Sequence, residues 1–187
     1  MASRAADGLA GAVHSIELLL DAATDAAVRD QWQALRATEL PTQADHPGDS
    51  NAPHVTLAAR PLFDDAADER LREAFAAALP LPVDLGSLVV FGAPPRGLVL
   101  VRLVVVRAEL LDLHARVHDA LERSEHDARH TTPGHWTPHV TLAHRMTPDQ
   151  LARASAFCRC IASLKPVRST PMPRARSASW VRSSGKP

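Results

Sequence analysis

The feature that most constrains this chain is a block of eight residues that occurs twice. PHVTLAAR occupies residues 53–60, and PHVTLAHR occupies residues 138–145. Seven of the eight residues agree, and only Ala59 against His144 differs. Little other identity joins the two halves of the chain. The repeat therefore indicates two matched strands that each need this particular block.

The elements expected around each copy follow the same order. Hydrophobic spacing predicts strand, helix, block, helix and strand in the first half, and the second half begins in the same way. The first strand is apolar at nearly every position, which is typical of a central strand. The expected segments are strand 13–20, a helix opening at Thr24 and Asp25, a helix after Asp64 and Asp65, strand 83–91, strand 97–106, helix 109–123 and a helix with a capping box of Thr147, Pro148 and Gln150.

The end of the chain breaks this order. A closing strand of the second half is expected after residue 164, but the sequence there is rich in proline and serine, and only SASWV at 177–181 resembles a strand. Residues 150–187 hold 8 basic residues and no acidic one, whereas residues 1–149 hold 13 basic and 21 acidic residues. We therefore predict that residues 164–187 form a basic Pro/Ser/Arg-rich tail that lacks the strand. Such a tail is either disordered or altered, for instance by a shifted reading frame, and a nucleic-acid-binding arm is the alternative.

Composition is that of an ordinary globular chain. The 187 residues are 45% hydrophobic and 22% charged, which suffices for one well-buried domain. The longest apolar runs are strand-sized, and the first residues lack the pattern of a secretory signal. The two cysteines are too few for a disulfide framework. We expect a cytoplasmic, monomeric protein that does not enter a membrane.

The block places its polar side chains on one face of a strand. Because side chains alternate along a strand, His54 and Thr56 point to one side, and the aliphatic residues next to them point to the other. His139 and Thr141 repeat the arrangement in the second copy. Two such strands side by side would surround one anionic, oxygen-rich group with two imidazoles and two hydroxyls.

A phosphodiester is a group that suits these side chains. In-line cleavage needs a base on the attacking oxygen and an acid on the leaving oxygen, and histidine can supply either near neutral pH. Two histidines on opposite sides of the phosphorus meet this need without a metal or cofactor, so we expect none. If both strands stay regular, Arg60 and Arg145 follow on the same face and are candidate substrate contacts.

Paired H-x-T blocks in a duplicated chain resemble the 2H phosphoesterase superfamily, and above all its group of 2′–5′ RNA ligases and RNA 2′,3′-cyclic phosphodiesterases. The resemblance covers roughly residues 13–163. It implies an α+β fold in which two pseudo-symmetric lobes with antiparallel sheets flank a central cleft and carry their helices outside. Residues 1–163 would form this single bilobal domain, with lobes of about 13–91 and 97–163 interleaved across the cleft.

The resemblance also implies an activity. Members hydrolyse a 2′,3′-cyclic phosphate at the end of an RNA or on a nucleotide to a 2′-phosphomonoester without a metal, and some ligate 2′–5′ ends reversibly. Carried onto this sequence, His54 protonates the leaving 3′-oxygen and His139 activates water, while Thr56 and Thr141 hold the non-bridging oxygens. The sequence leaves the two histidine roles interchangeable.

The second block departs from some of these relatives, which carry an arginine at the position of His144. Arg145 follows one place later in this chain. An offset of one residue changes the face of a strand, so the contact of Arg145 with a phosphate depends on the local geometry.

Further histidines lie outside the blocks. His135 and Trp136, in the loop before the second block, are candidate contacts to a base, the tryptophan by stacking. Packing of Trp136 inside the fold is the alternative. His114 and His118 lie four apart on a predicted helix, a spacing that can bind a metal, but no acidic or cysteine ligand accompanies them at a diagnostic spacing.

Alternatives to an RNA-end phosphodiesterase stay open. They are an enzyme for a small nucleotide such as an ADP-ribose cyclic phosphate, a non-catalytic RNA-binding relative, and a histidine-rich metal-binding protein. The shortage of basic and aromatic residues in 1–149 favours a small substrate over long RNA, whose binding usually needs a basic track. Glycine patterns that bind a triphosphate are absent from the sequence, so ATP-dependent ligation is not expected.

Overall fold

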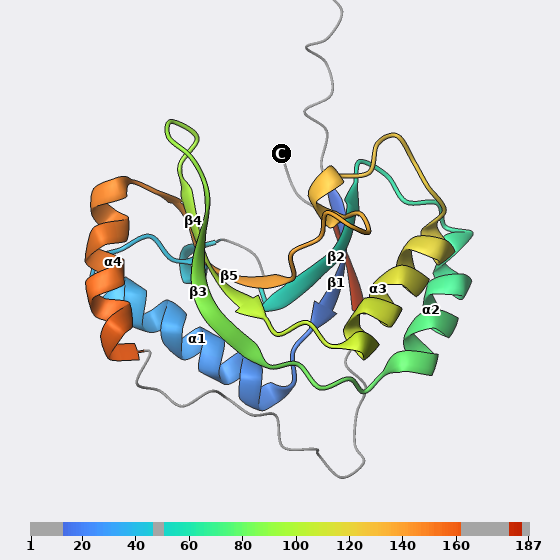
Figure 1. The fold of residues 1–187 in the computed structure, drawn as a ribbon, viewed down its shortest axis with the longest axis horizontal. Coiled ribbons are helices and arrows are strands. Elements are labelled where there is room, and N and C mark those ends of the chain that lie inside the picture. The colour runs from blue at the N-terminus through green and yellow to red at the C-terminus, as the bar shows by residue number, and fades with distance from the viewer. Residues whose placement is uncertain (1–12, 47–50, 162–179, 185–187) are drawn as a thin grey trace, which may run out of the picture.

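The computed structural model describes residues 13–46, 51–161 and 180–184, shown in Figure 1. In chain order the elements are strand β1 (His14–Leu19), helix α1 (Ala22–Ala37), 3-10 helix η1 (Gln43–Asp45), β2 (His54–Arg60), α2 (Ala67–Ala78), β3 (Leu85–Gly92), β4 (Leu98–Val104), α3 (Ala108–Leu121), η2 (Arg129–Thr131), β5 (His139–Met146), α4 (Pro148–Ile161) and β6 (Trp180–Ser184). The two copies of the repeated block form β2 and β5.

The strands of the described residues form two antiparallel sheets of three strands each. One has the order β2-β1-β6 and the other β3-β4-β5. This confirms the predicted α+β class with antiparallel sheets. β1 lies at the centre of its sheet, as its apolar sequence predicted, and Ile16 and Leu18 are each 1% exposed. The duplication into two pseudo-symmetric lobes stays a prediction, favoured by the fact that both sheets have a motif strand at one edge.

Each sheet takes its third strand from the other half of the chain. β3 ends the first half and pairs with β4, whereas β6 ends the second half and pairs with β1. The expectation that the closing strand is missing is therefore wrong. β6 has a weak strand pattern, and the backbone partner that β1 offers outweighs the local preference of its residues. The rest of the predicted tail lies outside the described residues.

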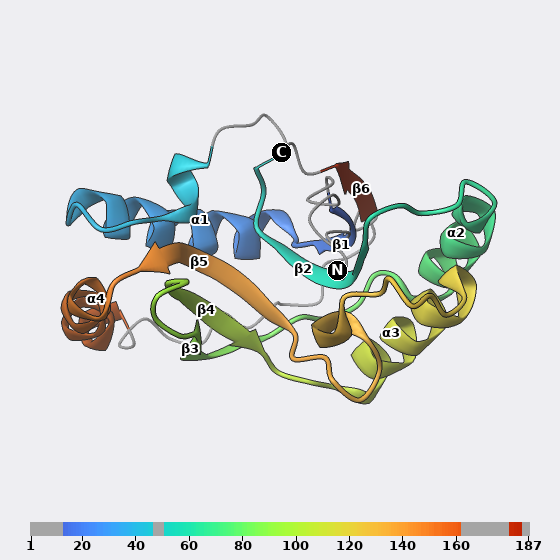
Figure 2. The same ribbon diagram turned by 90° about the horizontal axis from the view of Figure 1, so that it is seen from above.

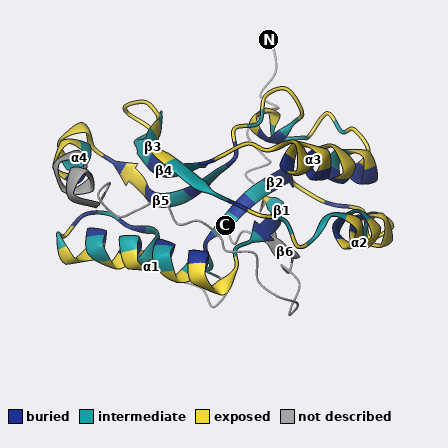
Figure 3. Ribbon diagram, turned by 60° about the horizontal axis from the view of Figure 1, so that its bottom comes forward, coloured by how far each residue is buried: buried dark blue, intermediate teal, exposed yellow. Residues whose placement is uncertain are grey.

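Each half of the chain contributes a helix that packs against the motif strand of the other half. α1 contacts the motif strand β5, and α3 contacts the motif strand β2. Seen from above in Figure 2, α1 and α4 lie beside the β3-β4-β5 sheet, and α2 and α3 lie at the other end. The predicted apolar stripe of α1 is buried, with Val28, Trp32 and Leu35 no more than 2% exposed. Figure 3 shows that the exposed residues of the helices face outward.

The helix starts follow local hydrogen bonding. Thr147 and Gln150 form the predicted capping box: the Thr147 N–H donates to Gln150 Oε1 at 2.8 Å, and the Gln150 N–H donates to Thr147 Oγ1 at 3.2 Å. α1 begins earlier than predicted, because the Asp21 carboxylate accepts the backbone N–H groups of Ala23 and Thr24.

A buried ion pair anchors the far end of β2. Arg60 is 8% exposed, and its Nε lies 2.8 Å from Oδ1 of Asp127. The same guanidinium donates to the backbone carbonyls of Leu121 and Glu122, which end α3. Asp127 also accepts the backbone N–H of Ser124 at 3.0 Å. The pair therefore ties β2 to the loop that leads toward β5.

Breaking this pair should destabilise the fold strongly. Asp127→Ala leaves the Arg60 cation buried without its counter-ion, so we expect the free energy of unfolding in urea to fall by about 3 kcal/mol. The matched control is Glu69→Ala, which removes the partner of exposed Arg72 on α2 and should cost no more than about 0.5 kcal/mol. Equal losses in the two variants would contradict the anchoring role.

Candidate active site

The two motif strands share one local irregularity. In β2, the register with β1 skips Leu57, directly after Thr56. In β5, the register with β4 skips Leu142, directly after Thr141. Each block therefore carries a β-bulge at the same position, and bulges at such places redirect the side chains that follow.

Before the bulge, the two faces of each strand are as predicted. His54 and Thr56 are half-buried, while Val55 between them is 0% exposed. β5 shows the same burial pattern over its first five residues, so His139 and Thr141 are also half-buried and share a face. The repeated block thus builds the same pair of polar side chains twice.

Beyond the bulge, the faces exchange. In a regular strand Arg60 would return to the face of His54, but the extra residue turns it to the opposite side, where it meets Asp127. We therefore do not retain Arg60 as a substrate contact. The residue that follows on the polar face is Ala59 in the first copy and His144 in the second. His144 is the functional candidate that sequence reasoning missed, and its difference from Ala59 was the signal.

The two imidazoles are oriented in the same way. Nδ1 of His54 lies 2.8 Å from the carbonyl oxygen of Ala52, and Nδ1 of His139 lies 2.7 Å from that of Thr137. A carbonyl oxygen only accepts hydrogen bonds, so Nδ1 carries the proton in both rings. Nε2 is then the atom that each neutral ring has available to take up a proton.

The two histidines are close enough to interact electrostatically. Burial lowers the pKa of His139, and the charges of His130 and His54 lower it further, while the hydrogen bond to Thr137 opposes the shift. The ring of Phe91 packs edge-on against His139 with 5.0 Å between the ring centroids. Burial of its ring therefore favours the neutral form of His139.

Two tryptophans hold the bulges in place. Nε1 of Trp136 donates to the carbonyl oxygen of Thr56 at 2.9 Å, and Nε1 of Trp32 donates to that of Thr141 at 3.0 Å. Each indole reaches the motif strand of the other half of the chain. In the described part of the chain, neither threonine hydroxyl has a hydrogen-bond partner, so both are available to a ligand.

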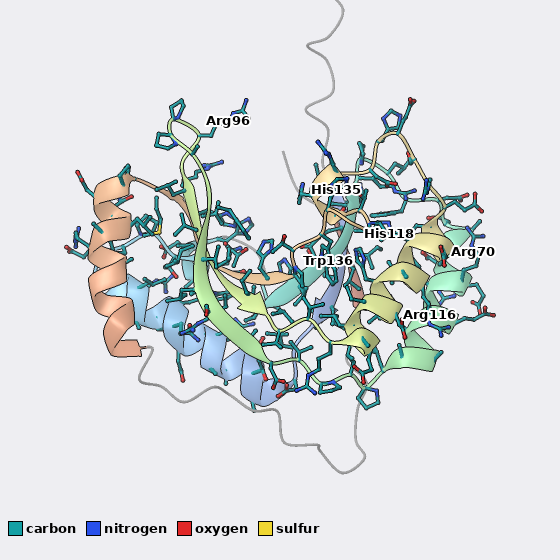
Figure 4. All side chains as sticks on the ribbon, in the orientation of Figure 1. Arg70, Arg96, Arg116, His118, His135 and Trp136 are labelled. Atoms are coloured by element: carbon teal, nitrogen blue, oxygen red, sulfur yellow. The ribbon has the colours of Figure 1, made fainter. Side chains whose placement is uncertain are left out.

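Trp136 is fixed by a stack of rings, labelled in part in Figure 4. Its ring lies parallel to that of His114, with centroids 3.9 Å apart, and His118 contacts His114 edge-on. Nε2 of His114 lies 2.9 Å from the carbonyl oxygen of Thr131, and Nε2 of His118 lies 3.2 Å from that of Leu57. One face of Trp136 is thus covered, which favours packing over base stacking.

The two remaining predicted substrate contacts, His135 and Arg145, are both exposed. His135 is exposed on the loop before β5 (Figure 4). Arg145 is exposed at a second irregularity of β5, where its φ is 55° and its Cα would lie 2.8 Å from a Cβ added to Gly97. His144 lies beside it and is also exposed; the protein around its ring lowers its pKa by partial desolvation, as do the nearby charges of His46, Arg145, His139 and His54. The structure therefore groups His144 with the two motif histidines.

The comparison with known families agrees with this geometry. A family model described as the 2'-5' RNA ligase superfamily matches residues 24–170, a range that contains both blocks. The chain belongs to the 2'-5' RNA ligase superfamily, which confirms the resemblance seen in the sequence. Membership gives it a 2H phosphoesterase or RNA ligase type of function toward RNA or nucleotides. No curated protein matches the chain significantly.

Within residues 13–46 and 51–154, no three His, Cys, Asp or Glu side chains gather in a way that could hold a metal ion. Nε2 of His114 and Nε2 of His118 each contact a backbone carbonyl. The helices in this part of the chain are too short or too polar to cross a membrane.

The ring stack should make stability depend on pH. Burial lowers the pKa of His114 from 6.5 to about 4, so the unfolded chain takes up a proton that the folded chain refuses. The contribution of His114 to the free energy of unfolding is therefore fully present above pH 6.5 and is lost as pH falls from 6.5 toward 4. Between pH 7 and pH 5 the loss is about 2 kcal/mol.

His114→Gln does not titrate and should remove that part of the pH dependence in urea unfolding. His126→Gln, at an exposed histidine of the following loop, is the matched control and should keep the wild-type slope. A wild-type slope in His114→Gln would show that the buried ring does not carry the effect.

Proposed function

We propose that the chain is a metal-independent phosphodiesterase that hydrolyses 2′,3′-cyclic phosphate ends of RNA or nucleotides to a 2′-phosphomonoester. The observation that carries the proposal is the pair of half-buried imidazoles, His54 and His139, which have the same orientation and interact electrostatically. Family membership supplies the class of substrate.

The two environments support a division of labour. The pKa of His139 is lowered by burial, so its Nε2 is free to accept a proton from the attacking water. As the water oxygen bonds to phosphorus, the bond to O3′ breaks, and Nε2 of His54 gives its proton to O3′. The products are a 2′-phosphomonoester and a free 3′-hydroxyl. The same sequence, with a 5′-hydroxyl in place of water as the attacking group, would be 2′–5′ ligation.

The hydroxyls of Thr56 and Thr141 are placed to hold the non-bridging oxygens. Each stands two residues from its histidine on the same face, without an internal hydrogen-bond partner in the described part of the chain. Neutral donors aimed at developing charge stabilise a transition state at little reorganisation cost. His144, on the same face of β5, is a further candidate contact to the phosphate, with exposed Arg145 and His135 at the margin.

A small nucleotide, such as an ADP-ribose cyclic phosphate, is the second candidate substrate. Residues 1–149, which contain both blocks, hold 13 basic and 21 acidic residues, and such a surface repels a long polyanion. A non-catalytic RNA-binding role is the outcome to accept if a folded protein binds RNA ends without turning them over.

Hydrolysis should require both histidines and survive chelation. With excess EDTA, wild type should open nucleoside 2′,3′-cyclic phosphates, and His54→Ala or His139→Ala should each lower kcat by a factor of at least about 100. The control is His126→Ala, which removes an exposed imidazole of the preceding loop and should keep wild-type activity. Loss of wild-type activity in EDTA, or an active His54→Ala, contradicts the mechanism.

The acid limb of the pH profile should report His139. A base acts when neutral, and burial lowers the pKa of His139, so kcat/KM should fall only as pH drops below the ordinary imidazole value of about 6.5. Phe91→Ala removes the ring packed on His139 and should move this limb toward higher pH, because the ring becomes better solvated. A wild-type limb centred above pH 6.5 would assign the base to another group.

A further inference from the structure

The repeated blocks are alike, but the strands beside them are not. Glu17 of β1 lies opposite Thr56, on the same side as His54. Val101 of β4 lies opposite Thr141 at the matching place in the other sheet. A carboxylate therefore stands next to one histidine, where a fully buried aliphatic side chain stands next to the other.

Glu17 is held in a defined position. Glu17 is 9% exposed, and the hydroxyl of Ser15 donates to its Oε1 at 2.6 Å. The same Oε1 lies 3.6 Å from Nε2 of His54. That separation allows a charge interaction but is longer than a hydrogen bond, so a proton on Nε2 remains available to a substrate oxygen.

A buried carboxylate beside a phosphate site is unfavourable for binding an anion, so its presence calls for a role in the reaction. The groups that face His54 from other elements are Glu17 on β1 and the imidazoles of His139 and His144 on β5. Both imidazoles oppose a positive charge on His54 when they are protonated. Among the described residues, Glu17 is the acidic side chain that lies within ion-pair distance of this ring.

We propose that Glu17 is a positioning residue that keeps His54 protonated and its Nε2 in place, and so assigns the acid role to the first of two otherwise equivalent histidines. The inference deepens the proposed function and rests on it for the meaning of that role. The 3.6 Å approach of Glu17 Oε1 to Nε2 of His54 exists whether or not the substrate has been identified correctly.

The first test follows the His54 ring by NMR as pH is varied, with the signal assigned from His54→Ala. Glu17→Gln keeps the shape and the Ser15 contact but removes the charge, and should lower the pH of half-protonation of His54 by about half to one unit. Ser15→Ala should shift it in the same direction by less. Glu73→Gln, an equal charge change on exposed residue Glu73 of α2, should leave it unchanged. An unshifted His54 in Glu17→Gln overturns the proposal.

The second test uses turnover of a nucleoside 2′,3′-cyclic phosphate. In Glu17→Gln the alkaline limb of kcat should move to lower pH by the same amount, so that kcat on that limb falls about three- to tenfold. KM should not rise, because the variant also removes a charge that repels the phosphate. A higher KM with an unmoved limb would make Glu17 a binding or structural residue.

The two tests separate the two claims. If Glu17→Gln shifts the titration of the His54 ring but the wild type turns over no cyclic phosphate, the proposed activity is rejected and the Glu17–His54 coupling is kept. If the wild type is fully active but Glu17→Gln leaves the titration of the His54 ring unchanged, the activity is kept and the role of Glu17 is rejected.

Discussion

The β-bulge after each motif threonine is the constraint on which the site depends. A bulge interrupts the backbone ladder, and the carbonyls beside it need other partners. Trp136 and His118 take those of Thr56 and Leu57, and Trp32 takes that of Thr141. Because these side chains come from the opposite half of the chain, the bonds that satisfy the bulges also hold β2 against β5.

The site combines two equal blocks with unequal surroundings. Equal blocks give both imidazoles the same tautomer through the same carbonyl contact, two residues earlier. In the proposed mechanism, unequal surroundings separate their tasks: burial lowers the pKa of His139, against which Phe91 packs, whereas Glu17 places a carboxylate oxygen 3.6 Å from Nε2 of His54. Hydrolysis of a phosphodiester needs this difference, because one group must take a proton while the other gives one.

Much of this architecture was predictable from periodicity and repetition. Strands β1 to β5, the four α-helices, the central position of β1, the capping box of α4 and the shared face of each His-Thr pair follow from local patterns. The failures concern long-range structure. β6 could not be predicted because its partner β1, rather than its own sequence, makes it a strand.

The misplaced arginine has a similar cause. Arg60 was expected beside the substrate, because alternation was continued through a bulge that the sequence does not announce. Glu17 was not singled out either, since one acidic residue in an apolar strand has no meaning until the register places it opposite Thr56. The identity of the residue opposite a motif depends on pairing, which single-sequence patterns do not encode.

The central claim is that His54 and His139 serve one phosphate between them. Titration of the protein with a nucleoside 2′-monophosphate, the expected product, tests it directly when both imidazole rings are followed by NMR. The account predicts that both rings respond and that the two responses saturate with the same dissociation constant, with His126 unaffected. A response from one ring alone, or two different constants, would show that the repeated blocks do not form a single site.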